Sequence, residues 1–104
     1  MFAPRGQILR GVKMTAEEHK QAVKELTLIP GVGRSIADDL IEIGITRVSQ
    51  LKNKDPEKLY NKSNRDKGVV QDRCVLYTFR CAVYFASNEA HDEEKLKWWN
   101  WKDK

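Results

Sequence analysis

The sequence predicts an all-α fold, a bundle of five to six helices around one modest core. Apolar residues recur at helical spacing along most of the chain, and capping residues mark the starts and ends of these segments. Strand-like alternation of apolar and polar residues is absent from the sequence. A chain of 104 residues is long enough for a single domain. We therefore expect one domain over residues 14–104, preceded by an arm at residues 1–13.

The arm reads MFAPRGQILRGVK and has little periodicity. It carries one proline, two glycines and three basic residues, so we expect it to be flexible and basic. Met14 stands directly before the first expected helix. The arm is therefore either native or an extension from an upstream start, and the sequence leaves both alternatives open.

The first helix is expected to begin at Thr15, because Thr15-Ala16-Glu17-Glu18 has the residue types of a capping box. An apolar stripe follows at helical spacing and is made of His19, Ala22, Val23 and Leu26. We interpret His19 as a half-buried helix residue and not as a metal ligand or base. Other His or Cys residues at ligand spacing from it are absent from the sequence.

The loop Pro30-Gly31-Val32-Gly33 organises the chain, because apolar residues at helical spacing flank it on both sides. Glycine tolerates positive φ and close backbone approach, so this loop can reverse the chain between two helices, with Val32 pointing inward. The second helix then begins with free amides at about Gly33, Arg34 and Ser35. Free amides and the helix dipole both favour a phosphate oxygen, so we expect an anion site at this turn.

These residues resemble the helix-hairpin-helix motif, in which an apolar residue precedes Gly-apolar-Gly and the small Ala37 lets the helices cross closely. The resemblance implies a DNA-backbone binder without sequence preference, whose contact residues are Gly31, Val32, Gly33 and Arg34, with the amide of Ser35 beside them. Related hairpins also hold a monovalent cation through loop carbonyls. The alternative is a helix-helix corner whose glycines serve geometry alone.

The second helix of this pair is expected from about Arg34 to Ile43, ending at Gly44 as a left-handed C-cap. Thr46 is expected to cap a very short helix. Asp55-Pro56 predicts another helix start, with an N-cap followed by proline in the first turn. That helix is expected to fade into the polar run at residues 61–68.

A long helix is expected from Val69 to about Ser87, and it is apolar around most of its circumference. Such a helix belongs in the middle of a bundle. Lys67-Gly68-Val69 joins it to the preceding helix, and this turn is a candidate for a degenerate second hairpin. Against that interpretation, one glycine stands where the first hairpin has two.

The charge distribution favours one electropositive side. The formal net charge is +4, and mild basicity permits nucleic-acid binding without requiring it. Between Ile45 and Arg80 basic residues outnumber acidic residues nine to four, which makes this segment the expected electropositive side. We expect three of these residues to add charge to the DNA site: Lys62, Arg65 and Lys67.

Three acidic residues argue in the opposite direction. Asp38, Asp39 and Glu42 lie on the second helix of the hairpin, where they would repel a DNA backbone. The alternative is an ordinary solvated helix face. Arg73 and Arg80 share one face of the long helix, and they either contact phosphates or pair with carboxylates of neighbouring helices.

A last helix is expected to begin at Asp92-Glu93-Glu94 and to carry a tryptophan-rich end. Trp98, Trp99 and Trp101 alternate with lysines, as in a base-stacking platform for single strands. We favour the alternative, in which two of the three tryptophans fix this segment to the bundle.

The sequence does not support a catalytic, metal or redox role. Cys74 and Cys81 lie about 10 Å apart along one helix, too far for a disulfide, and we expect them to be buried as small apolar residues in a reduced, cytoplasmic protein. The longest apolar run, at residues 74–86, is too short to span a bilayer, and a secretory signal is absent. We expect no enzyme activity, cofactor, metal, membrane or small-molecule substrate, because catalytic motifs and a second domain that could form a cleft are absent.

Two further strings, QDRCVLYTFRCAVYF at residues 71–85 and LKWWNWKD at residues 96–103, resemble a small bacterial helix-hairpin-helix family labelled "pathogenicity locus". Together with Leu26–Gly44, the resemblance covers most of residues 15–103. It implies an all-α, SAM-domain-like fold and DNA binding, with no established reaction. The leading hypothesis is weak, salt-sensitive DNA binding without sequence preference. The alternative is a protein-protein interaction module that docks through the acidic helix or the tryptophan-rich end.

Overall fold

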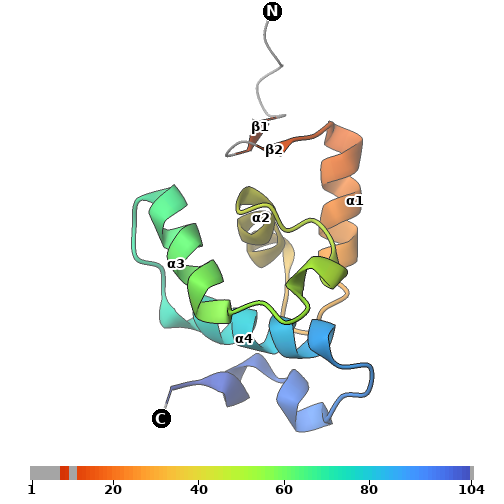
Figure 1. Ribbon diagram of the computed structural model, residues 1–104, viewed down its shortest axis with the longest axis vertical. Coiled ribbons are helices and arrows are strands. Elements are labelled where there is room, and N and C mark those ends of the chain that lie inside the picture. The colour runs from red at the N-terminus through yellow and green to blue at the C-terminus, as the bar shows by residue number, and fades with distance from the viewer. Residues whose placement is uncertain (1–7, 10–11, 104) are drawn as a thin grey trace, which may run out of the picture.

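The computed structural model describes residues 8–9 and 12–103 and arranges them as a helical bundle (Figure 1). Within these residues the expected five to six helices are replaced by four α-helices and three short 3₁₀ helices. The α-helices are α1 (Ala16–Leu26), α2 (Arg34–Glu42), α3 (Pro56–Lys67) and α4 (Arg73–Ser87). The 3₁₀ helices are η1 (Val48–Leu51), η2 (Glu93–Leu96) and η3 (Trp98–Trp101). The all-α class predicted from the sequence is confirmed.

One short strand pair precedes the bundle. β1 (Ile8–Leu9) pairs antiparallel with β2 (Val12–Lys13). The sequence does not predict these strands, because two residues are too few to show an alternating pattern. The rest of the predicted arm, at residues 1–7 and 10–11, lies outside the described residues.

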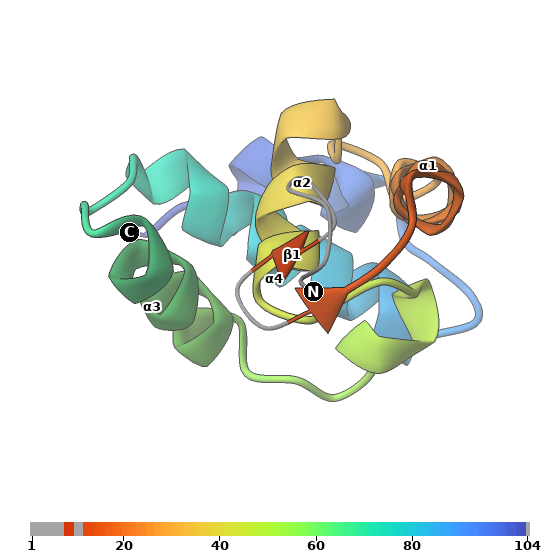
Figure 2. The same cartoon turned by 90° about the horizontal axis from the view of Figure 1, so that it is seen from above.

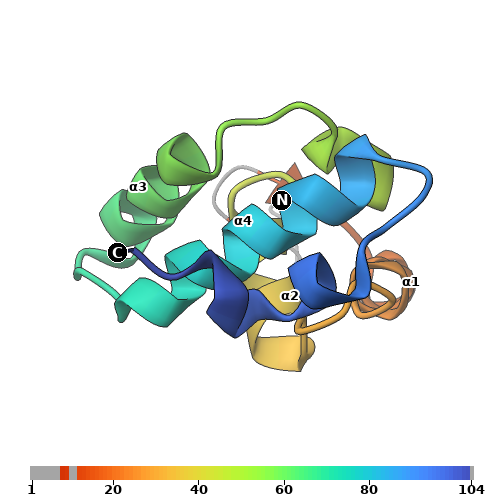
Figure 3. The same ribbon diagram turned by 90° about the horizontal axis from the view of Figure 1, so that it is seen from below.

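Helix α4 forms the centre of the bundle, as its apolar circumference predicts. α1, α2 and α3 lie side by side over it (Figure 2), and the C-terminal segment with η2 and η3 covers its opposite side (Figures 1 and 3). Leu76 and Phe79 on α4 are completely buried, as are Leu26 of α1 and Leu40 of α2. Packing of helix faces onto one central helix supplies most of the stability, because short helices are marginal by themselves.

Most of the predicted helix ends are confirmed. Thr15 and Glu18 form the reciprocal capping box, with bonds of 2.9 and 3.1 Å. Gly44 follows α2 with a φ of +95°, and Asp55 caps α3 ahead of Pro56. Thr46 is different, because the short helix η1 is closed by Gln50, whose side-chain oxygen accepts bonds from the backbone of residues 46 and 47.

The boundary between α3 and α4 differs from the prediction. α3 does not fade but continues to Lys67, and Gly68 ends it with a φ of +72°. α4 then begins at Arg73 instead of Val69, because the carboxylate of Asp72 accepts a bond from the backbone of Cys74 and caps the first turn. Val70, which the sequence places within the long helix, lies before α4 and is 85% exposed.

The predicted last helix is replaced by two 3₁₀ turns. Lys97 has extended backbone angles and separates η2 from η3. Trp101 packs against Tyr84, with ring centroids 5.6 Å apart, and its indole donates a 2.7 Å bond to the carbonyl of Lys95. These contacts pull the segment onto α4, and short 3₁₀ turns follow the surface of α4 where a straight helix would leave it.

Candidate nucleic-acid interface

The corner between α1 and α2 is anchored to the core from below. Ile29 and Val32 are buried, and the amide of Val32 donates a 3.0 Å bond to the carbonyl of Ile29. Val32 therefore points inward, as the sequence predicts. The amides of residues 28 and 29 also bond back to the last turn of α1. These bonds and contacts fix the shape of the corner.

Helix α2 begins with exposed amides. Its N-cap, Gly33, has extended backbone angles and offers no side chain to the first turn. The carbonyl of Gly33 accepts the first helical bond from Ala37, at 2.9 Å. Within the described part of the chain, the amides of Gly33, Arg34 and Ser35 have no hydrogen-bond partner, and all three residues are exposed. Unpaired amides at the positive end of a helix dipole are the geometry that anions prefer.

The two glycines of the corner have different structural roles. Gly31 has a φ of +86°, and a Cβ atom placed on it would lie 3.1 Å from Cδ1 of Trp98. This position requires glycine both for its backbone angle and for the closeness of the indole. Gly33 has a negative φ and open space around it, so a side chain would fit there. Gly33 leaves the helix end uncovered because it has no side chain.

Cys81 lies beneath the same corner. Its thiol is completely buried and lies 3.9 Å from the carbonyl oxygen of Pro30 and 3.4 Å from that of Leu96. Burial raises the pKa of this thiol to about 11, so it stays protonated and can donate to these carbonyls. The prediction of structural burial is confirmed for Cys81, whereas Cys74 is only partly buried.

The predicted basic residues do not gather around the exposed amides. Arg34 is exposed at the corner itself. Lys62 donates to the carbonyl of Ile43, and Lys67 pairs with Glu42, so both lie at the far end of α2. That end is roughly 13 Å from the amides, given 1.5 Å per residue. Arg65 is exposed on the last turn of α3, the helix that carries both lysines.

The acidic residues of α2 have partners within the protein. Nε2 of His19 lies 3.0 Å from Asp38, and His19 is half-buried as predicted. The ammonium of Lys67 lies 2.9 Å from Asp39 and 3.1 Å from Glu42. The bond with Asp39 is the main reason why the pKa of Lys67 is raised, so this lysine stays charged. The acidic face is therefore partly neutralised from inside.

Arg73 and Arg80 pair with carboxylates. Nε of Arg73 lies 3.0 Å from Asp103, and Arg80 lies 3.0 Å from Asp103 and 3.2 Å from Glu57. The bond from Arg73 lowers the pKa of Asp103 below its usual value. Of the two alternatives left open by the sequence, the structure has the ion pairs. The pairs with Asp103 fasten the C-terminal segment to α4, and the pair with Glu57 joins α4 to α3.

The three tryptophans have different environments. Trp98 packs on Gly31 and Trp101 on Tyr84, whereas Trp99 is 49% exposed. Two of the three therefore fix the C-terminal segment to the bundle, as predicted. The contact between Trp98 and the glycine corner is a feature that sequence reasoning missed. The periodicity of the sequence does not indicate this contact, because the two residues are far apart in the sequence.

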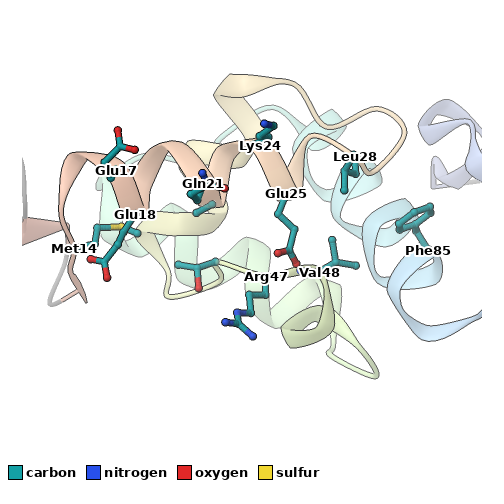
Figure 4. A pocket seen from close by; sticks show the side chains of 12 residues that line it. Met14, Glu17, Glu18, Gln21, Lys24, Glu25, Leu28, Arg47, Val48 and Phe85 are labelled. Atoms are coloured by element: carbon teal, nitrogen blue, oxygen red, sulfur yellow. Dashed lines mark hydrogen bonds between the residues drawn. The ribbon is translucent and has the colours of Figure 1, made fainter.

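An open groove runs beside α1 on another side of the molecule (Figure 4). Its floor is apolar, with Leu28 and Phe85 at one end and carboxylates of α1 at the other. Glu25 within it accepts a 2.8 Å bond from the backbone of Val48. In the described part of the chain, no group of three or more His, Cys, Asp or Glu residues could hold a metal ion. Among the helices of this part, none has the length and apolar character to cross a membrane.

Fold and site together define a small all-α domain with an uncovered helix start at a glycine corner. Residues 19–104 match the family model Cdd1, described as "Pathogenicity locus", and the chain belongs to this family. It is also 35% identical over 77 residues to the mitomycin resistance protein McrB of Streptomyces lavendulae, which covers 74% of this chain and 70% of that protein. The predicted resemblance to the family is confirmed. No solved structure gives a significant match.

Proposed function

We propose that this protein binds the DNA backbone, without reading base sequence, through the corner between α1 and α2 acting as a helix-hairpin-helix motif. One observation carries the proposal: the exposed amides of Gly33, Arg34 and Ser35 have no partner within the described residues. The role is binding, with no reaction. The two free cysteines fit the reduced, cytoplasmic setting expected for such a role.

The phosphate would be held mainly by backbone groups. Amides at a helix start make charge-assisted bonds to phosphate oxygens, and such bonds fix position without reading sequence. Arg34 would add a positive charge at the same place, because it is exposed beside these amides. Arg65 and Lys62 would reach a more distant phosphate. Lys67 contributes less, because its charge is shared with two carboxylates.

The acidic residues of α2 weaken the proposal less than the sequence suggests. Lys67 pairs with two of the three, Asp39 and Glu42, so part of their field is cancelled. Binding would still be weak, because one corner contacts few phosphates. With about two phosphates neutralised, log affinity should fall with log salt at a slope of roughly −2.

The test uses position 33, where the structure accepts a side chain. Gly33→Asp fits the backbone angles and the open space, and aspartate is a preferred N-cap, so the fold should be kept. Its carboxylate would bond the free amides and repel a phosphate. Gly33→Asn is the matched control, since it also caps the helix but carries no charge.

Labelled duplex DNA is titrated with wild type and both variants at two salt concentrations. We expect Gly33→Asp to lose about tenfold or more in affinity, equivalent to about 1.4 kcal/mol, and Gly33→Asn to lose less. The difference between the variants should shrink at high salt. Equal binding by all three proteins would show that the α1–α2 corner does not bind DNA.

A second candidate function is a protein-interaction module in which the corner is only structural. Docking through the acidic helix is less favoured, because Asp38, Asp39 and Glu42 are engaged internally. The observation in favour is Leu28, which is 71% exposed at the groove beside α1. Affinity capture from a native lysate, with and without nuclease, separates the two candidates. Partners that depend on DNA are lost after nuclease treatment, and direct protein partners are kept.

A further inference from the structure

We propose that Trp99 stacks on an unpaired base beside the phosphate held at the α1–α2 corner. The protein would then prefer DNA that contains unpaired bases to intact duplex. This inference rests on the proposed function, because the corner supplies the phosphate contact that places the base near the ring. It adds the class of DNA that the site would select.

The C-terminal segment lies directly against the corner. A Cβ atom on Gly31 would lie 3.1 Å from Cδ1 of Trp98, so the indole packs on the backbone of the loop. The segment crosses beneath α4 beside the loop that joins α1 to α2 (Figure 3). The tryptophan-rich turn and the exposed amides therefore belong to one region of the surface, although they are far apart in the sequence.

Trp99 is the most exposed of the three tryptophans. Its ring packs edge-on against Trp98, with centroids 5.8 Å apart and an interplanar angle of 86°. Trp98 and Trp101 are partly buried against the bundle, but Trp99 remains 49% exposed. Trp98 therefore lies between the loop and the exposed ring of Trp99 and packs against both.

The charge around Trp99 is mixed, because Glu93 and Glu94 of η2 are exposed in the same segment. Lys102 is exposed in the same segment, and Lys97 keeps a half-exposed side chain although it pairs with Glu94. Lysines beside an aromatic ring are the usual combination in single-strand binding surfaces, where stacking gives on the order of five- to a hundredfold in affinity per base.

An unpaired base is required by the geometry of stacking. Bases inside a duplex already have both faces covered, so a protein ring reaches them only if the duplex opens. A single-stranded extension or a gap offers a free face without that cost. The phosphate contact is the same in all of these DNAs, so the preference should come from the ring alone.

The experiment compares a blunt duplex with the same duplex carrying a single-stranded extension, by fluorescence anisotropy. Four proteins are measured: wild type, Trp99→Ala, Trp99→Phe and Val70→Ala. Val70 is a matched control, since it is an exposed apolar residue in the loop between α3 and α4. We expect wild type to favour the extended DNA by about fivefold or more, and Trp99→Ala to lose that preference while its duplex affinity is unchanged. Trp99→Phe should keep most of the preference, and Val70→Ala all of it.

The outcomes separate the inference from the proposed function. Equal affinity of wild type for both DNAs, or an equal loss on both DNAs in Trp99→Ala, overturns the stacking role. Gly33→Asp, measured alongside, should weaken both DNAs together. If Gly33→Asp binds both like wild type, the corner is not the phosphate site and the proposed function fails, whatever Trp99 does.

Discussion

In the described part of the molecule two helix-loop-helix corners, α1–α2 and α3–α4, have different N-cap residues at the start of their second helix. Each loop holds a glycine with positive φ, Gly31 in the first corner and Gly68 in the second. The N-cap of the helix after the first corner is Gly33, which has no side chain to cover the amides. The N-cap of the helix after the second is Asp72, whose carboxylate accepts a 2.9 Å bond from the amide of Cys74. The residue at the N-cap, and not the topology, decides whether a helix start is free for an anion.

The corners also differ in what holds them, which is apolar burial in the first and hydrogen bonds between Gln71 and α3 in the second. Ile29 and Val32 of the first are buried and Trp98 lies against its loop, whereas Val69 and Val70 of the second are 59% and 85% exposed. The first corner is therefore held in its shape by the core and by Trp98. The degenerate second hairpin considered from the sequence shares the turn but carries an anion of its own at the helix start.

The largest effect is expected from Gly31, and Gly68 serves as its comparison. Gly31→Ala should lower the free energy of unfolding by about 2–3 kcal/mol, because alanine is strained at positive φ and its Cβ would press on Trp98. Gly68→Ala has the same backbone strain but open space, so about 1 kcal/mol is expected. Urea denaturation measures both. Equal losses would mean that the Trp98 contact adds nothing.

The two valines test the anchoring. Val32→Ala removes buried methyl groups and should cost about 2 kcal/mol of stability. Val70→Ala changes an exposed side chain and should stay within about 0.5 kcal/mol of wild type. Thermal and urea unfolding of the pair provide the measurement. A large loss in Val70→Ala would mean that Val70 contributes apolar contacts despite its exposure.

The N-caps should differ in their response to pH. The bond from Cys74 lowers the pKa of Asp72 from its ordinary value of 3.8. Its contribution to stability is therefore present above pH 3.8 and is lost as the pH falls through the lower folded-state pKa. The stability difference between wild type and Asp72→Ala should vanish in that acidic range. Gly33→Asp should gain a similar dependence, which wild type lacks at the first corner; unfolding curves across pH show both.

The smallest expected difference is in the rate at which the two cysteines are alkylated. Cys81 lies fully buried under the first corner with a pKa of about 11, whereas Cys74 is half-buried at the second. Desolvation raises the pKa of Cys74 as well, so both thiols should react slowly. We expect Cys74 to be modified first in the native protein and Cys81 only after unfolding. Mass spectrometry of peptides after timed alkylation checks the order.

Features that depend on neighbouring residues could be predicted from the sequence. The capping box at Thr15, the stop at Gly44 and the start at Asp55 each need only three or four residues. The central place of α4 follows from its own composition. The start of α4 was missed because Asp72 as a cap competes with an apolar run that begins at Val69.

The parts of the candidate site that could not be predicted depend on contacts between distant segments. Lys67 pairs with Asp39 on another helix, and this pairing removes it from the charges expected near the corner. Trp98 reaches Gly31 only because the C-terminal segment folds back under α4. Local spacing does not encode such contacts, whereas it does indicate the exposed amides at the start of α2.

The packing of Trp98 on Gly31 links two positions that are far apart in the chain. They share one small volume, so the size of the residue at one limits the size allowed at the other. A relative with a side chain at position 31 would need a smaller residue at position 98. Among such proteins the residues at positions 31 and 98 should therefore change together. The C-terminal segment and the α1–α2 corner would then vary as one structural unit.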